Sequence, residues 1–111
     1  MLFTDPLRDN RNFRRLYAKG RSCVGSCMVL YGRKNRTSGS RLGITVGGKV
    51  GNAVVRNKIR RRLREIYRLH ESELAPGFDM VIVARGRAAG AAYACLESEF
   101  MALCGRLGIK A

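Results

Sequence analysis

The sequence predicts a single α+β domain that comprises residues 1–111, and three observations support this prediction. A chain of 111 residues rarely divides into two domains. Hydrophobic residues make up 46% of the chain, which is enough to build one buried core. Segments with the helical spacing of apolar residues alternate with shorter runs typical of strands, in the order helix, strand, strand, helix, strand, helix.

The first predicted elements are a short helix and two strands. Asp9 or Asn10 can cap a helix that ends just before Gly20. Residues 23–31 and 41–46 are rich in strand formers, and a polar stretch with several turn formers separates them. Apolar side chains alternate with others in the second run, so we expect one face of that strand to be buried.

The second half of the chain predicts a long helix, a strand and a last helix. Three glycines follow the second strand, and a short third strand could form around Lys49. Asn52 can cap a helix over about residues 53–69. Residues 78–85 are apolar at both odd and even positions, as in a strand covered on both faces. The apolar residues of 91–106 recur with helical spacing.

The charge of the chain indicates a polyanionic partner. Its 22 Lys and Arg against 8 Asp and Glu give a net charge of +14. The whole excess lies in residues 10–64, which contain 16 basic residues and no acid. A surface that only confers solubility mixes its signs. The pattern therefore favours nucleic acid as partner over an acidic membrane surface.

The four cysteines and the acidic residues predict no metal site and no active site. The chain has no Cys-x-x-Cys pair, so we expect its thiols to pack as small hydrophobic groups. The acid pairs Glu71/Glu73 and Glu97/Glu99 are spaced i, i+2 and do not share a helix face. His70 is the only histidine and has no evident partner for acid–base catalysis.

The predicted long helix has one apolar stripe and a basic remainder. The stripe consists of Val55, Ile59, Leu63 and Ile66. Arginines at positions 56, 60 and 64 are spaced i, i+4 and i+8, so they repel each other by a few tenths of a kcal/mol per pair. A row of phosphates relieves this repulsion, because a guanidinium group binds phosphate oxygens with two parallel hydrogen bonds.

Residues 51–68, GNAVVRNKIRRRLREIYR, resemble the signature of the protein subunit of bacterial ribonuclease P, the ribonucleoprotein that removes 5′ leaders from precursor tRNA. FRRLYAKG at 13–20, MVLYG at 28–32, RLGITVGGKVGN at 41–52 and DMVIVAR at 79–85 follow in the family's order and spacing, so the resemblance covers nearly the whole chain. Lys58 departs from the family's Arg-Asn-Arg motif, and Gly47-Gly48-Lys49 replaces the common Ser-Lys-Lys.

The resemblance, together with the charge pattern, assigns candidate site residues. The expected RNA-binding residues are Arg56, Asn57, Lys58, Arg60, Arg61, Arg64, Arg68 and Lys49. Asn57 could hold a base edge, a water or a metal-bound water, or simply face solvent. Family members hold the single-stranded leader in a cleft between the first helix and the sheet, and Phe13, Tyr17 and Tyr31 match it. Aromatic rings stack on unpaired bases, although rings at i, i+4 are ordinarily core residues.

The resemblance also implies a fold and a mechanism. The fold is a small α/β sandwich with a central mixed sheet of about four strands and a left-handed βαβ crossover, like domain 2 of ribosomal protein S5. The RNA subunit is expected to cleave the precursor with Mg²⁺ that is bound mainly by RNA, which gives the mature tRNA 5′ end. The protein would bind that subunit and the 5′ leader, with no catalytic residue, no membrane and no obligate protein partner. Its first residues lack a signal peptide, so we expect a cytoplasmic protein.

Two other classes of function remain open on the residues alone. Gly48-Lys49-Val50-Gly51 fits the short loop motif of KH domains, which would make the chain a pure binding module such as a ribosomal protein. The KH loop joins two helices, however, whereas this one follows a strand. The arginine-rich helix could instead enter a DNA major groove, although neither a leucine zipper nor a helix-turn-helix partner adjoins it.

Overall fold

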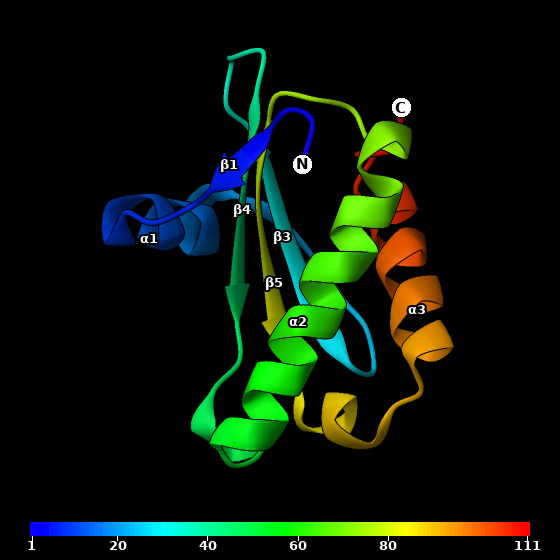
Figure 1. Ribbon diagram of the computed structural model, residues 1–111. Helices are drawn as coiled ribbons and strands as arrows, with labels where there is room; N and C mark the ends of the chain where they lie inside the picture. Colours follow the sequence, from blue (N-terminus) through cyan, green and yellow to red (C-terminus); the bar gives the residue numbers. More distant parts are fainter.

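The computed structural model describes all 111 residues and has the expected α+β architecture (Figure 1). Its strands are β1 (Thr4–Pro6), β2 (Arg21–Val24), β3 (Met28–Lys34), β4 (Ser40–Thr45) and β5 (Phe78–Ala84). Its α-helices are α1 (Asn10–Lys19), α2 (Ala53–His70) and α3 (Tyr93–Arg106), and the short 3-10 helices are η1 (Gly48–Val50), η2 (Glu71–Glu73) and η3 (Gly86–Gly90). The sheet thus has five strands where about four were expected.

The five strands form one mixed sheet in the order β1-β4-β5-β3-β2. β4 pairs in parallel with β1 and with β5, while β3 pairs antiparallel with β5 and with β2. In Figure 1 the arrows of β4 and β5 point down, α2 lies in front of the sheet, and the chain moves to the right between them. This is the left-handed sense of a βαβ crossover, whereas about 98% of such crossovers are right-handed. The prediction from the resemblance is confirmed.

Two predictions about strands are wrong, and one strand was missed. Residues 23–31 do not form one strand but the hairpin β2–β3, whose turn is closed by a 2.8 Å hydrogen bond from Gly25 N–H to the Met28 carbonyl. The residues around Lys49 form η1 instead of a strand, because Val50 N–H bonds back to the Gly47 carbonyl at 3.1 Å. The missed strand is β1, which has only three residues and adds to the edge of β4.

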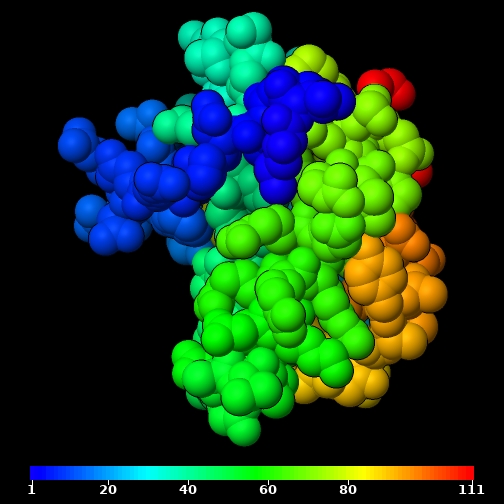
Figure 2. Space-filling view, viewed as in Figure 1, coloured from blue at the N-terminus to red at the C-terminus, as the bar shows by residue number.

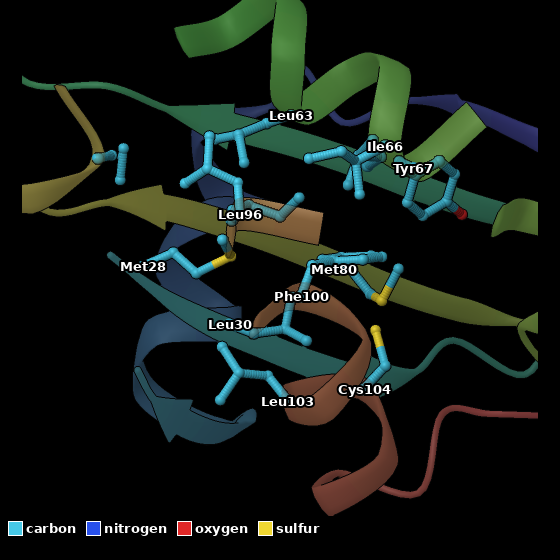
Figure 3. Packing of buried hydrophobic residues seen from close by; sticks show 14 of the residues in the cluster. Met28, Leu30, Leu63, Ile66, Tyr67, Met80, Leu96, Phe100, Leu103 and Cys104 are labelled. Carbon is cyan, nitrogen blue, oxygen red and sulfur yellow. The ribbon is translucent and has the colours of Figure 1, made fainter. Parts of the chain in front are cut away.

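The main core lies between the sheet and the layer of α2 and α3. Figure 3 shows Met28, Leu30 and Met80 of the sheet facing side chains from both helices. The predicted stripe of α2 enters this core, with Ile59, Leu63 and Ile66 buried and Val55 half-buried. Tyr67 is buried as well, and its hydroxyl lies 2.7 Å from Thr4 Oγ1.

The cysteines have different environments. Cys104 packs in the main core, where burial raises its pKa to about 12. The expectation of a small hydrophobic group therefore holds for this residue. Cys95 is exposed, so the expectation is wrong there.

The opposite face of the sheet is covered only by α1. Asp9 caps this helix by accepting a 2.9 Å hydrogen bond from Arg11 N–H. Leu16 packs on the sheet with Leu7 and Val81 in a small second cluster, and Phe13 contacts its rim. Figures 1 and 2 show α1 projecting from the side of the molecule, away from α2 and α3. Because one ten-residue helix is narrower than the sheet, open surface remains on both of its flanks.

Charged side chains join distant segments around the end of α2. The expectation that His70 has no acidic partner is wrong. His70 bonds to Glu97 of α3 at 2.7 Å and to Glu73, and these two hydrogen bonds raise the pKa of the imidazole. Buried Glu71 accepts hydrogen bonds from the backbone N–H groups of Leu2 and Phe3, so it ties the N-terminal segment to the helix. These acids have structural partners.

Candidate nucleic-acid interface

The predicted basic residues lie together on the solvent side of α2 and on η1. We define the α2 basic surface as Arg56, Asn57, Lys58, Arg60, Arg61, Arg64 and Arg68 with Lys49 of η1. Most of these side chains are exposed, and Arg56 and Arg60 are half-buried. In Figure 2 the residues of α2 form much of the visible face of the molecule. The amphipathic pattern produces this arrangement, because burial of the apolar stripe turns the remaining positions outward.

A shallow hollow of about 530 Å³ lies on the first turns of α2. Three arginines, Arg60, Arg61 and Arg64, line it with Val54 and Asn57. The Asn57 Oδ1 atom accepts a 3.0 Å hydrogen bond from the Arg60 guanidinium, so the amide orients that arginine. Val54, which was not predicted as a site residue, is 77% exposed among these cations. A flat apolar spot within a ring of guanidinium groups suits a sugar or base between phosphates.

Other arginines of α2 differ in their freedom to bind a ligand. The Nε atom of Arg56 is buried and has no hydrogen-bond partner, so this side chain keeps an unused donor. Arg62 donates to the Ala91 carbonyl at 3.4 Å and holds α2 against the segment before α3. Arg68 makes two hydrogen bonds to Glu65, at 2.5 and 3.0 Å, and lowers the pKa of that carboxyl. Arg68 is therefore the most neutralised residue of the surface.

Two of the predicted aromatic residues, Phe13 and Tyr17, line a second hollow beside α1, whereas Tyr31 packs against Tyr17 and is not part of the lining. This hollow, which we call the leader cleft after the role that the resemblance leads us to expect, has a volume of about 550 Å³ and is lined by Asn10, Phe13, Arg14, Tyr17 and Thr45. The ring centroids of Tyr17 and Tyr31 are 5.0 Å apart in an edge-to-face arrangement, and those of Phe13 and Tyr17 are 6.4 Å apart. Tyr17 is 43% exposed, whereas Phe13 and Tyr31 are half-buried.

Gly43 of β4 sets how closely α1 approaches the sheet. A Cβ atom at this position would lie 2.6 Å from Cζ of Phe13. The missing side chain therefore lets the Phe13 ring rest on the strand, where it forms one wall of the leader cleft. Arg14 and Thr45 add a cation and a hydroxyl to this cleft, and neither residue was predicted.

The titratable groups do not form an evident metal centre. No three His, Cys, Asp or Glu side chains come together in a way that could hold a metal ion. Glu99 accepts hydrogen bonds from Ser26 and Cys27 N–H, and Asp79 is paired with Arg41. None of the α-helices combines the length and the apolar composition that a membrane crossing requires.

An arginine-rich helix and an aromatic cleft on a mixed sheet define an α+β nucleic-acid-binding protein. Comparison with known proteins narrows this class. The sequence pattern described as "Ribonuclease P" matches residues 3–108. A ribonuclease P protein component from Clostridium botulinum strain 657 is 39% identical over 104 residues, which cover 93% of this chain and 94% of the relative. One from Lachnoclostridium phytofermentans is 42% identical over 100 residues, which cover 90% and 86%.

Solved structures agree with the sequence comparison. The RNase P protein of Staphylococcus aureus superposes with a TM-score of 0.87 at 31% identity, covering 96% of this chain and 97% of that protein. The RNase P protein of Thermotoga maritima superposes with a TM-score of 0.83 at 32% identity, covering 92% and 96%. The chain therefore belongs to the ribonuclease P protein family.

Proposed function

We propose that the chain acts as the auxiliary protein of ribonuclease P in tRNA processing. It binds the RNA subunit through the α2 basic surface and the 5′ leader of precursor tRNA in the leader cleft. It thereby assists the endonucleolytic cut that gives the mature tRNA 5′ end. The observation that carries this proposal is the pairing of a cationic helix face with an aromatic cleft in a member of this family.

The two surfaces suit different forms of RNA. Guanidinium groups on α2 are spaced along one helix face and bind phosphates without regard to sequence, as contact with a folded RNA requires. The leader cleft offers Tyr17 and Phe13 as stacking platforms and Arg14 as a cation for the backbone. Stacking on aromatic rings contributes about 1–3 kcal/mol per base and tolerates any base, which suits leaders of varied sequence.

Metal binding is assigned to RNA in this proposal. Hydrolysis of a phosphodiester commonly uses Mg²⁺ ions held by carboxylates. The carboxylates of this chain do not fit such a site, because the one acid of the α2 face, Glu65, is paired with Arg68 and the other acids form no group of three that could hold a metal ion. This distribution supports the proposal that Mg²⁺ is bound mainly by RNA and that the RNA subunit performs the chemistry.

Reconstitution tests the division of labour. The isolated protein is expected to leave precursor tRNA intact, whereas protein, RNA subunit and Mg²⁺ together cleave it at the mature 5′ end. The products are read by gel electrophoresis of end-labelled precursor. Specific cleavage by RNA-free protein, with nuclease contamination excluded by a mock purification, would overturn the proposal.

A substitution tests the leader cleft separately. Phe13→Ala removes one stacking wall, so it should weaken binding of precursor tRNA to the holoenzyme by about the free energy of one stacked base, 1–3 kcal/mol. Binding of mature tRNA, which has no leader, serves as the internal reference. An equal loss for both RNAs would return Phe13 to a purely structural role.

A further inference from the structure

A third hollow lies on the other flank of α1. We call it the α1–β3 pocket; it has a volume of about 310 Å³, and five cations line it: Arg15, Arg33, Lys34, Arg36 and Arg41. The leader cleft includes Thr45 at one end of β4, whereas this pocket includes Arg41 near the other end. Four residues of strand separate the two positions, a distance of about 13 Å. The helix α1 thus divides this face of the sheet into an aromatic half and a cationic half.

The pocket carries a strong excess of positive charge. Its one carboxylate, Asp79, accepts hydrogen bonds of 2.9 and 2.6 Å from Arg41 and a third of 3.0 Å from Asn35. Asp79 therefore neutralises Arg41 and holds it in place. The other four cations take part in none of the ion pairs of the protein. Unpaired cations gathered in a concave site favour an anionic ligand.

The loop that supplies Arg36 is held in a defined shape. Arg36 has a φ of 62° and is the only residue other than glycine with a positive φ. The Asn35 side chain on one side donates to the Gly39 carbonyl at 3.0 Å and accepts from Thr37 N–H at 2.9 Å. A non-glycine residue kept in this sparsely populated conformation by its neighbours is a feature of functional sites more than of ordinary loops.

The exposed side of α1 connects the two hollows with further cations. Arg11, Arg15 and Lys19 are spaced i, i+4 and i+8, and all three are exposed. Arg14 lies on the flank of the leader cleft. The helix contains no acid, so these like charges repel one another in the free protein and a polyanion laid across the helix relieves the repulsion.

From this continuity we infer that the α1–β3 pocket binds phosphates of the same single strand whose bases stack in the leader cleft. The strand leaves the aromatic half, crosses α1 and places its upstream phosphates among Arg15, Arg33, Lys34 and Arg36. The inference rests on the proposed function, because it takes the 5′ leader as the strand in the cleft. It adds a second, cationic subsite for leader nucleotides upstream of those in the leader cleft, which would be bound through phosphate contacts that do not depend on sequence.

The test uses the reconstituted holoenzyme and precursor tRNAs whose leaders range from about 4 to about 16 nucleotides, the span of known single-strand site sizes. Affinity of the unmodified holoenzyme should rise with leader length. The double variant Arg15→Ala, Arg36→Ala should lose the gain from the upstream nucleotides, about fivefold at the longest leader, and match the unmodified protein at the shortest. Its salt dependence with long leaders should fall by about 0.7 per lost phosphate contact.

Two further variants control for charge and for folding. Arg106→Ala, Lys110→Ala removes the same amount of charge from the last residue of α3 and from the segment that follows it, and it should leave the whole length series unchanged. Arg15→Lys, Arg36→Lys keeps the charge and should keep most of the gain. Thermal unfolding shows whether each variant is folded.

The outcomes separate this inference from the proposed function. An unchanged length series in the Arg15→Ala, Arg36→Ala variant would overturn the inference, as would an equal loss at every leader length, which assigns the pocket to another part of the RNA. Phe13→Ala should remove the gain from the nucleotides nearest the cleavage site. If it does not, the proposed leader cleft itself is wrong.

Discussion

Gly43 shows how the absence of one side chain shapes the leader cleft. A Cβ atom at Gly43 would lie 2.6 Å from the Phe13 ring and 3.4 Å from a methyl group of Val81. We expect Gly43→Ala to push the ring and α1 away from the sheet and to lower the free energy of unfolding by about 1–3 kcal/mol, as overpacking does. Urea denaturation measures this, and leader binding should weaken in parallel.

Gly47→Ala is the matched control for this prediction. Nothing lies within 4 Å of a Cβ atom built at Gly47, and its φ of −77° suits any residue. Its free energy of unfolding should change by less than about 0.5 kcal/mol. Equal effects of the two substitutions would mean that close approach of Phe13 is not what requires glycine at position 43.

The attachment of the N-terminal segment through Glu71 depends on pH. Burial opposes ionisation of this carboxyl, but hydrogen bonds from the Thr4 hydroxyl and from Leu2 and Phe3 N–H, with the nearby terminal amine, lower its pKa. Because its pKa is lower in the folded state, the Glu71 carboxylate stabilises the protein at pH values above its unfolded-state pKa of about 4.3. This stabilisation is lost as the pH falls through the folded-state pKa.

Glu71→Gln should therefore destabilise the protein at neutral pH by about 1–2 kcal/mol. The neutral amide replaces a charged acceptor, and its NH2 group is a donor that cannot accept the hydrogen bonds from the Leu2 and Phe3 N–H groups. It should also flatten the decline of stability in acid. Urea denaturation at several pH values between about 3 and 7 follows both effects. Asp5→Asn is the control, because Asp5 is exposed and makes no side-chain hydrogen bond in the structure. A variant as stable as the unmodified protein at neutral pH would show that the Glu71 charge does not hold the N-terminus.

At the scale of elements, α2 combines a structural face with a binding face, and the two should respond differently to substitution. The side chain of Arg64 is exposed and makes no hydrogen bond, and the side chain of Arg60 bonds only to Asn57. Arg60→Ala or Arg64→Ala should weaken binding of the RNA subunit and reduce the slope of log affinity against log salt by about one unit each. Thermal stability should change little.

Filter binding at several salt concentrations measures the slope, and Arg106→Ala on α3 serves as a charge-matched control. A loss of thermal stability with unchanged affinity would make these two arginines structural. The result bears on Asn57 as well. If Asn57 acts by orienting Arg60, its own substitution should add little once Arg60 is gone.

The same elements show which features can be predicted from sequence. The helix predicted at 53–69 is found at Ala53–His70, because its apolar stripe and its Asn52 cap are local features. The hairpin β2–β3 was missed because its turn depends on Glu99, a residue 73 positions away, which accepts the Ser26 N–H at 2.7 Å. The strand β1 likewise forms only by pairing with β4, and no local sequence pattern predicts this pairing.

The site follows the same rule. An arginine-rich stretch can be recognised directly in a sequence, so the residues of the α2 basic surface could be named from their positions alone. What each arginine bonds to depends on tertiary structure, and the pairing of Arg62 with Ala91 and the orphaned Nε of Arg56 could not be foreseen. The cationic pocket beside α1 was missed for the same reason, since it joins side chains from α1, β3 and β4 that are far apart in the chain.

For the molecule as a whole, the separation of charge predicts how the protein's contribution to cleavage of precursor tRNA depends on salt. The basic excess of residues 10–64 lies on α1, on the strands and loops beside it, and on α2, whereas all eight acids lie outside this stretch of the chain, three of them on β5 and α3. A protein that binds RNA by neutralising phosphates releases counterions, and log affinity falls with log salt by about 0.9 per phosphate contact. Added cations perform the same neutralisation without the protein.

The ratio of cleavage rates with and without the protein should therefore be largest at low salt and decline steadily as monovalent salt or Mg²⁺ is raised. Single-turnover cleavage of precursor tRNA by the RNA subunit, with and without protein over a KCl series, measures this ratio. The Arg60→Ala, Arg64→Ala double variant should start from a smaller ratio and decline less steeply, because it has fewer counterions to release. A ratio that does not change with salt would show that positioning of the leader, and not neutralisation of phosphate repulsion, accounts for the protein's assistance.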